Sequence, residues 1–115
     1  MIKLTILYRE PADPEAFEAF YTANLALMER IPGVIRRQVN HIYGAPEGQP
    51  VFYRALELYF PDRDALDKGM RSEAGVQAGR HLMAHAAQLA EVFFSEVYEE
   101  AGGSTPEALP SSSAG

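Results

Sequence analysis

The order of strand-like and helix-like segments is the feature that most limits what this chain can fold into. Apolar residues alternate with others over Ile2–Arg9, which is typical of a strand, and then recur at helical spacing after Asp13. Strand-like segments return at 34–43 and 51–60, helical segments follow, and a last strand is expected at 92–98. The order β-α-β-β-α-β predicts an α+β fold, the ferredoxin-like sandwich, in which the helices cover one face of a four-stranded antiparallel sheet.

Capping residues and helix breakers place the helix ends. Asp13 followed by Pro14 is an N-cap with proline at the first helical position, and Pro32-Gly33 ends this helix. Asp62 and Ser72 are expected to cap two further helices, over 63–69 and 73–90. The stripe predicted to be buried in the last helix comprises Val76, Arg80, Met83, Ala87 and Ala90.

The length of 115 residues fits a single domain. We predict that this domain spans residues 1–100. Gly, Ser and Pro dominate residues 101–115, so this segment is expected to be a disordered or loosely packed tail.

Composition excludes several classes of protein. With no Cys, the chain has no disulfides, no thiol nucleophile and no cysteine-based metal site. A net charge of -6 argues against nucleic-acid binding, because Lys and Arg are too few to neutralise phosphates. Neither a signal peptide nor an apolar run of the roughly 20 residues needed to cross a bilayer is present, so a soluble cytoplasmic protein without membrane contact is expected.

The strand expected at 51–60 is apolar on both of its faces. One face carries Phe52, Leu56, Leu58 and Phe60; the other carries Val51, Tyr53, Ala55 and Tyr59, together with Glu57. Since helices cover only one face, an apolar second face indicates an interface. We expect a homodimer packed through this sheet face, a dimeric α-β barrel that buries on the order of 1,200–2,000 Å².

The first candidate site residue is Asn24, on the buried stripe of the first helix beside Tyr21. A buried amide needs hydrogen-bond partners. It is therefore either a structural residue bonded to neighbouring backbone, or a ligand-orienting group at the mouth of a cleft between helix and sheet. In the second interpretation Asn24 binds the ligand together with Tyr8, Tyr21, Glu57 and Tyr59.

The second candidate is the carboxylate of Glu57, beside Tyr53 and Tyr59 on the mostly apolar strand face and joined there by Tyr8 or Arg9 of the first strand. A desolvated carboxylate of this kind can serve as a general base. The structural alternative is an ion pair at the dimer interface, with Arg9, Arg36 or Arg54 as its partner.

His81 and His85 lie four residues apart, which is the spacing of a helical metal-binding pair. The zinc-protease motif has a glutamate directly after its first histidine, and here that position holds Leu82. No third ligand is evident, so ordinary helix histidines are expected, with no metal and no cofactor.

Several segments together resemble the EthD family, which is named after ethyl tert-butyl ether degradation. They are MIKLTILY at 1–8, DPEAF at 13–17, IPGV at 31–34, YRALELYF at 53–60 and SEAG at 72–75. The resemblance implies the dimeric α-β barrel group and a small-molecule pocket. The family usually has a histidine in the first helix, followed two positions later by proline; here these positions hold Asn24 and Ala26. Asparagine cannot shuttle a proton near neutral pH as histidine can.

Three functions remain open at this point. The first is a small dimeric EthD-like protein that binds or transforms a small apolar organic compound between the first helix and the sheet, as an accessory to oxidative degradation. The second is a barrel-type monooxygenase, either cofactor-free or haem-linked through His81 or His85. The third is a non-catalytic dimerisation module. No catalytic residue is assigned, and the sequence does not decide whether the protein is an enzyme.

Overall fold

The computed structural model describes residues 1–102, so the predicted tail lies almost wholly outside the described residues. The elements are β1 (Ile2–Arg9), α1 (Pro14–Met28), β2 (Arg36–His41), β3 (Phe52–Phe60), α2 (Arg63–Arg71), α3 (Glu73–Ala86) and β4 (Ala90–Glu96). This order confirms the predicted α+β architecture.

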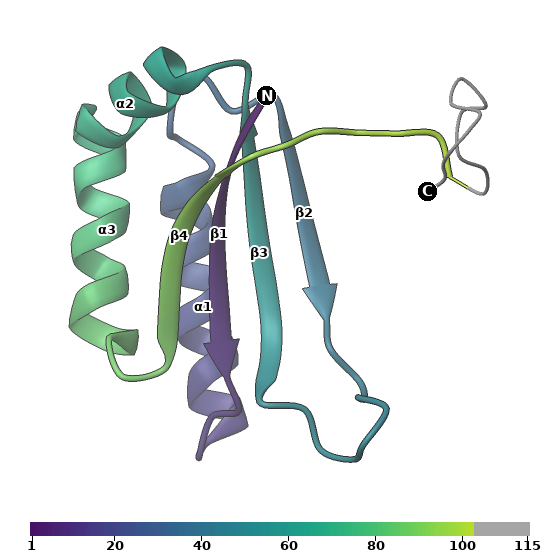
Figure 1. Cartoon of the computed structure of the whole chain (residues 1–115). Helices are drawn as coiled ribbons and strands as arrows, with labels where there is room; N and C mark the ends of the chain where they lie inside the picture. The colour runs from purple at the N-terminus through teal and green to yellow at the C-terminus, as the bar shows by residue number, and fades with distance from the viewer. Residues whose placement is uncertain (103–115) are drawn as a thin grey trace, which may run out of the picture.

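The four strands form one antiparallel sheet in the order β2-β3-β1-β4, with β1 and β3 at its centre. The helices lie on one side of this sheet, and β1 runs from the end next to α2 to the end where α1 begins (Figure 1). The ferredoxin-like arrangement with helices on one face is therefore confirmed.

The core lies between the helices and the inward rows of the two central strands. Ile2, Leu4, Ile6 and Tyr8 of β1 alternate inward, and β3 opposes them in register with Phe60, Leu58, Leu56 and Arg54. Three of these cross-strand pairs are apolar, and the fourth, at the end of the sheet where α1 begins, is Tyr8 with Arg54. The inward row is therefore apolar along most of the sheet and polar at that end.

The structure corrects two expectations for α3. The helix ends at Ala86 rather than at residue 90, because Ala90 already pairs with Tyr8 in the sheet. The predicted stripe faces outward: Val76 and Met83 are exposed. The buried residues of α3 are instead Gly75, Ala78, Leu82 and Ala86. Small residues on this face bring α3 close to its neighbours, an effect that side-chain hydrophobicity alone does not predict.

The outer face of the sheet is more polar than expected. Cross-strand pairing places Lys3, Thr5 and Leu7 of β1 on this face. The neighbouring strands add Arg36, Gln38, Asn40, Ala55, Glu57, Tyr59, Glu91, Phe93 and Ser95. Lys3 forms an ion pair with Glu57 at 3.3 Å. This face is therefore a mixture of charges and rings rather than the apolar lining that the sequence suggested.

After β4 the chain runs across the sheet towards β2 (Figure 1). Val97 donates its backbone N–H to the carbonyl of Met1, and Glu99 comes within 3.9 Å of Arg36. No helix within residues 1–102 is long and apolar enough to span a bilayer.

Candidate functional site

Helix α1 is set in place by its N-terminus, as the sequence predicts. The Asp13 side chain accepts a hydrogen bond from the backbone N–H of Ala16 at 3.1 Å, and Pro14 occupies the first turn. From this start, Phe17, Tyr21 and later Asn24 fall on the buried face. Helical spacing therefore presents two aromatic rings to the end of the sheet that carries Tyr8 and Arg54.

A β-bulge re-aims one side chain of β3. Tyr8 pairs with Arg54 and Arg9 pairs with Phe52, so Tyr53 has no partner on β1. A bulge of this kind breaks the two-residue alternation. The sequence placed Tyr53 on the outer face with Glu57. In the structure its ring instead packs edge-on against Phe17 of α1, with centroids 5.6 Å apart.

We call Tyr8, Phe17, Glu18, Tyr21, Tyr53 and Arg54 the Arg54 cluster. The guanidinium carbon of Arg54 lies 4.6 Å from the ring centre of Tyr21 and 5.4 Å from those of Phe17 and Tyr53. Its two terminal nitrogens donate to the two carboxylate oxygens of Glu18, at 2.8 and 2.7 Å. A planar cation is thus held between aromatic faces and one bidentate carboxylate.

Three buried polar atoms of the Arg54 cluster have no hydrogen-bond partner within the described residues. They are the hydroxyl oxygens of Tyr8 and Tyr21 and the Nε of Arg54. Burial raises the pKa of the Tyr8 and Tyr21 phenols, so both remain neutral donors at physiological pH. Buried donors without an acceptor are uncommon and are often found at functional sites.

The sequence reasoning did not assign Arg54 and Glu18 to a site. One signal for Arg54 was available, since an arginine interrupts an otherwise apolar inward row of β3. Glu18 gave no such signal, because its partner lies 36 positions away in the sequence.

Asn24 ties α1 to α3. Its Nδ2 donates to the backbone oxygen of Ala78 at 3.1 Å, and the same nitrogen lies 3.0 Å from Nδ1 of His81. Because a carbonyl only accepts, Nδ2 must face Ala78, and His81 Nδ1 accepts the other amide proton. Neutral His81 therefore carries its proton on Nε2. Oδ1 of Asn24 is buried and has no partner among residues 1–102.

The rings of His81 and His85 are tilted against each other, with centroids 4.4 Å apart, and Phe20 stacks on both. Burial, together with the nearby His85, lowers the pKa of His81. Nδ1 of His85 donates to the backbone oxygen of His81 at 3.0 Å. Within residues 1–102, no group of three His, Asp or Glu side chains is arranged to hold a metal ion.

The structure divides the five predicted ligand-binding residues between two faces. Tyr8 and Tyr21 meet edge to face at 5.9 Å, and Asn24 lies one helical turn beyond Tyr21. Glu57 and Tyr59 lie on the outer face instead. There the Tyr59 hydroxyl donates to Gln38 at 2.7 Å, and Arg36 lies over its ring at 4.3 Å.

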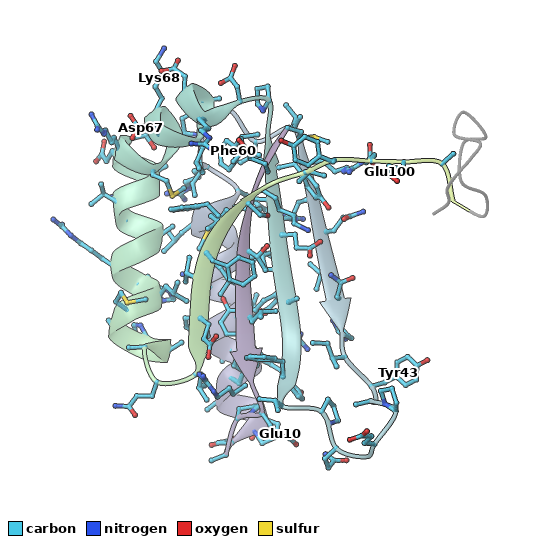
Figure 2. The ribbon with its side chains drawn as sticks, in the orientation of Figure 1. Glu10, Tyr43, Phe60, Asp67, Lys68 and Glu100 are labelled. Carbon is cyan, nitrogen blue, oxygen red and sulfur yellow. The ribbon has the colours of Figure 1, made fainter. Side chains whose placement is uncertain are left out.

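A large hollow lies at the other end of the sheet. It has a volume of about 760 Å³ and is lined by Ile2, Arg63, Leu66, Asp67, Met70, Phe94, Ser95, Glu96 and Tyr98. We call it the α2 hollow. Asp67, on α2, lies at the end of the molecule far from Glu10, which follows β1 (Figure 2). A smaller, almost wholly apolar cavity of about 90 Å³ shares Met70 and Phe94 with it.

The charged groups of the α2 hollow are already paired. Arg63 donates to Glu96 at 2.7 Å, and the Tyr98 hydroxyl donates to the same carboxylate at 3.0 Å. These donations lower the pKa of Glu96. The hollow has room and an apolar floor, but its polar side chains need no ligand.

Comparison with known proteins places the chain. No family model matches it. A structurally characterised EthD family protein from Bacillus halodurans is 33% identical, with a TM-score of 0.81 over 85% of this chain and 99% of that one. A dimeric ferredoxin-like protein of unknown function from Jannaschia is 20% identical, with a TM-score of 0.62 over 84% of this chain and all of that one (100%). An uncharacterised 11.0 kDa protein of Rhodococcus erythropolis, from a thcB-thcC intergenic region, is 27% identical over 97 residues, 84% of this chain and 94% of that protein.

The similarity to the Bacillus halodurans protein extends over nearly the whole domain and includes sequence as well as fold. The more distant Jannaschia structure shares the fold alone. The chain belongs to the EthD family.

Proposed function

We propose that this EthD family protein binds a small, mostly apolar organic compound that carries an oxygen atom, between α1 and the sheet, as a homodimer. The Tyr8 and Tyr21 hydroxyls and Arg54 hold the oxygen, and the rings around them hold the apolar part. Asn24 supports the site by holding α1 against α3. In keeping with the degradation after which the EthD family is named, we assign this binding an accessory role in oxidative degradation.

The observation that carries this proposal is the set of three buried, unpartnered polar atoms in the Arg54 cluster. Leaving a buried donor unsatisfied costs roughly 1–3 kcal/mol. A ligand oxygen that accepts from these donors recovers that energy. The α2 hollow is larger, but its ion pair and hydroxyl are already satisfied, which favours the Arg54 cluster as the specific site.

Nuclear magnetic resonance titration with benzyl alcohol tests the location. We expect shifts at Tyr8 and Tyr21, and a roughly threefold to tenfold weaker binding in Tyr21→Phe, the loss of one hydrogen bond. Shifts confined to Leu66 and Tyr98 would place the ligand in the α2 hollow and contradict the proposal.

The dimer is proposed through the outer face of the sheet, with Glu57 and Tyr59 inside the interface. The face has no helix over it, and Phe93 on it is 45% exposed. The Jannaschia structure with this fold is described as dimeric.

Sedimentation equilibrium tests the dimer. We expect the mass of two chains for the wild type and of one chain for Phe93→Glu, because an additional, unpaired carboxylate is expensive to bury in the interface. Val76→Glu, on the exposed side of α3, is the matched control and should stay dimeric. A one-chain mass for the wild type at micromolar concentration would contradict the proposal.

A further inference from the structure

The Arg54 ion pair is unequal in its exposure to water. The Arg54 side chain is 6% exposed, whereas that of Glu18 is 46% exposed. Among the ion pairs formed by residues 1–102, this is the one whose cation lies essentially inside the protein. A buried cation is therefore closed off from solvent by a side chain that is itself half in solvent.

Glu18 can leave this position more easily than Arg54 can. It stands on the first half of α1 with a flexible side chain, and water is available to its carboxylate once it turns outward. Arg54 has no such alternative, because strand pairing with Tyr8 and the rings of Phe17, Tyr21 and Tyr53 surround it.

Departure of Glu18 would leave a buried, unpaired guanidinium, which costs several kcal/mol. Another carboxylate in the same place restores the bidentate pair. Such a newcomer would take over the two Arg54 donors and the Tyr53 hydroxyl that Glu18 now uses. The Arg54 Nε and the Tyr8 and Tyr21 hydroxyls of the same cluster are donors that Glu18 leaves unused. The surrounding rings favour a flat, apolar body behind the carboxylate.

We propose that Glu18 occupies the place of a ligand carboxylate, and that the natural ligand is an aromatic or otherwise flat organic acid whose anion displaces Glu18 from Arg54. This inference rests on the proposed function, since it names the ligand class of the same site. Glu18 acts as an internal competitor: it keeps Arg54 neutralised while the site is empty, and it turns to solvent when the acid binds.

Isothermal titration with benzoate and with the neutral control benzyl alcohol tests the inference. In Glu18→Gln the internal competitor is uncharged, so benzoate should bind roughly tenfold more tightly than to the wild type, the order of one charged hydrogen bond. Benzyl alcohol has no charge with which to replace that of Glu18, so its affinity should change far less than that of benzoate. Glu15→Gln removes a neighbouring carboxylate of α1 that has no part in the cluster, and should leave benzoate affinity unchanged.

The outcomes separate the inference from the proposed function. If benzyl alcohol binds at the Arg54 cluster and Glu18→Gln leaves benzoate affinity unchanged, the acid inference is wrong and the proposed function stands. If neither compound binds the wild type or Glu18→Gln, both are wrong. If Arg54→Met binds benzoate as well as the wild type does, Arg54 is not the anchor and the inference is wrong.

A second measurement uses the wild type alone, in case Glu18→Gln does not fold. Benzenesulfonate keeps its charge in acid, whereas protonated Glu18 releases Arg54. Affinity for benzenesulfonate should therefore rise as the pH falls through the range in which Glu18 titrates. A flat or falling affinity over that range would overturn the inference.

Discussion

The two ends of the helix-covered sheet face differ in what they offer a ligand. The α2 hollow has about 760 Å³ of space, but its Arg63, Glu96 and Tyr98 side chains satisfy one another. The Arg54 cluster is filled with rings, yet three of its polar atoms lack partners within residues 1–102. The open volume and the unpartnered donors thus lie at opposite ends of the sheet. A hollow alone can accept many small molecules, whereas unpartnered donors favour ligands that carry a matching acceptor.

The largest expected effect comes from Asn24, which holds α1 against α3. Asn24→Ala removes two buried hydrogen bonds and leaves a small cavity, so the free energy of unfolding should fall by about 2–3 kcal/mol. Urea denaturation measures it. Thr22→Ala, on the exposed side of α1, should change stability by less than about 0.5 kcal/mol. Equal effects of the two variants would show that the hydrogen bonds of Asn24 do not stabilise the packing of α1 against α3.

Tyr8→Phe tests whether the unpartnered hydroxyl of Tyr8 lowers the stability of the protein without ligand. It removes a buried donor without an acceptor, so stability should rise by about 1 kcal/mol while benzyl alcohol affinity falls. Thermal denaturation and titration on the same sample measure both. A loss of stability of that size would mean that the hydroxyl is satisfied in the folded protein.

Acid should weaken the Arg54 cluster first through Glu18. Hydrogen bonds from Arg54 lower the pKa of the Glu18 carboxyl, so the unfolded chain takes up this proton more readily than the folded one. The stability that Glu18 contributes is complete above the unfolded pKa and is lost as the pH falls through the folded pKa. Unfolding free energies measured between pH 7 and pH 3 should decline less steeply in Glu18→Gln than in the wild type. Parallel curves would contradict this.

The smallest effect is expected at the α2 hollow. Arg63 and Glu96 are both solvent-exposed, so Arg63→Ala should change stability by no more than about 0.5 kcal/mol. It should also leave benzyl alcohol affinity unchanged. A clear loss of affinity would move the binding site to this end and reverse the comparison.

The regular parts of the fold could be predicted from local sequence. Alternation identified β1, and the caps Asp13, Asp62 and Ser72 accept hydrogen bonds as expected at the starts of three helices. Local rules did not extend to α3, whose buried face is chosen by how closely small residues let it approach its neighbours. They also missed the pairing of Glu18 with Arg54, because it forms only when α1 folds onto β3.

The same limit explains the site. The sequence predicted Tyr21 and Asn24 on the buried face of the first helix, and they lie there. It grouped Tyr8 with Glu57 and Tyr59, whereas in the structure Tyr8 points towards α1 and pairs with Arg54. It put Tyr53 beside Glu57 because period-two alternation was assumed to run the full length of the strand. The bulge opposite Tyr8 and Arg9 interrupts this alternation at Tyr53, and no residue type in β3 predicts a bulge there.

The bulge also divides β3 into two parts that pair differently with β1. Because Tyr53 has no partner, residues on the Phe60 side keep a regular pairing with β1, whereas the pairing of Phe52 is shifted by one residue. Losing one residue here would return the strand to uninterrupted alternation and turn one aromatic ring away from α1. The apolar rows beneath the helices would stay in step. The number of residues in β3 therefore sets which ring faces α1 at the Arg54 end, without any change in the composition of the core.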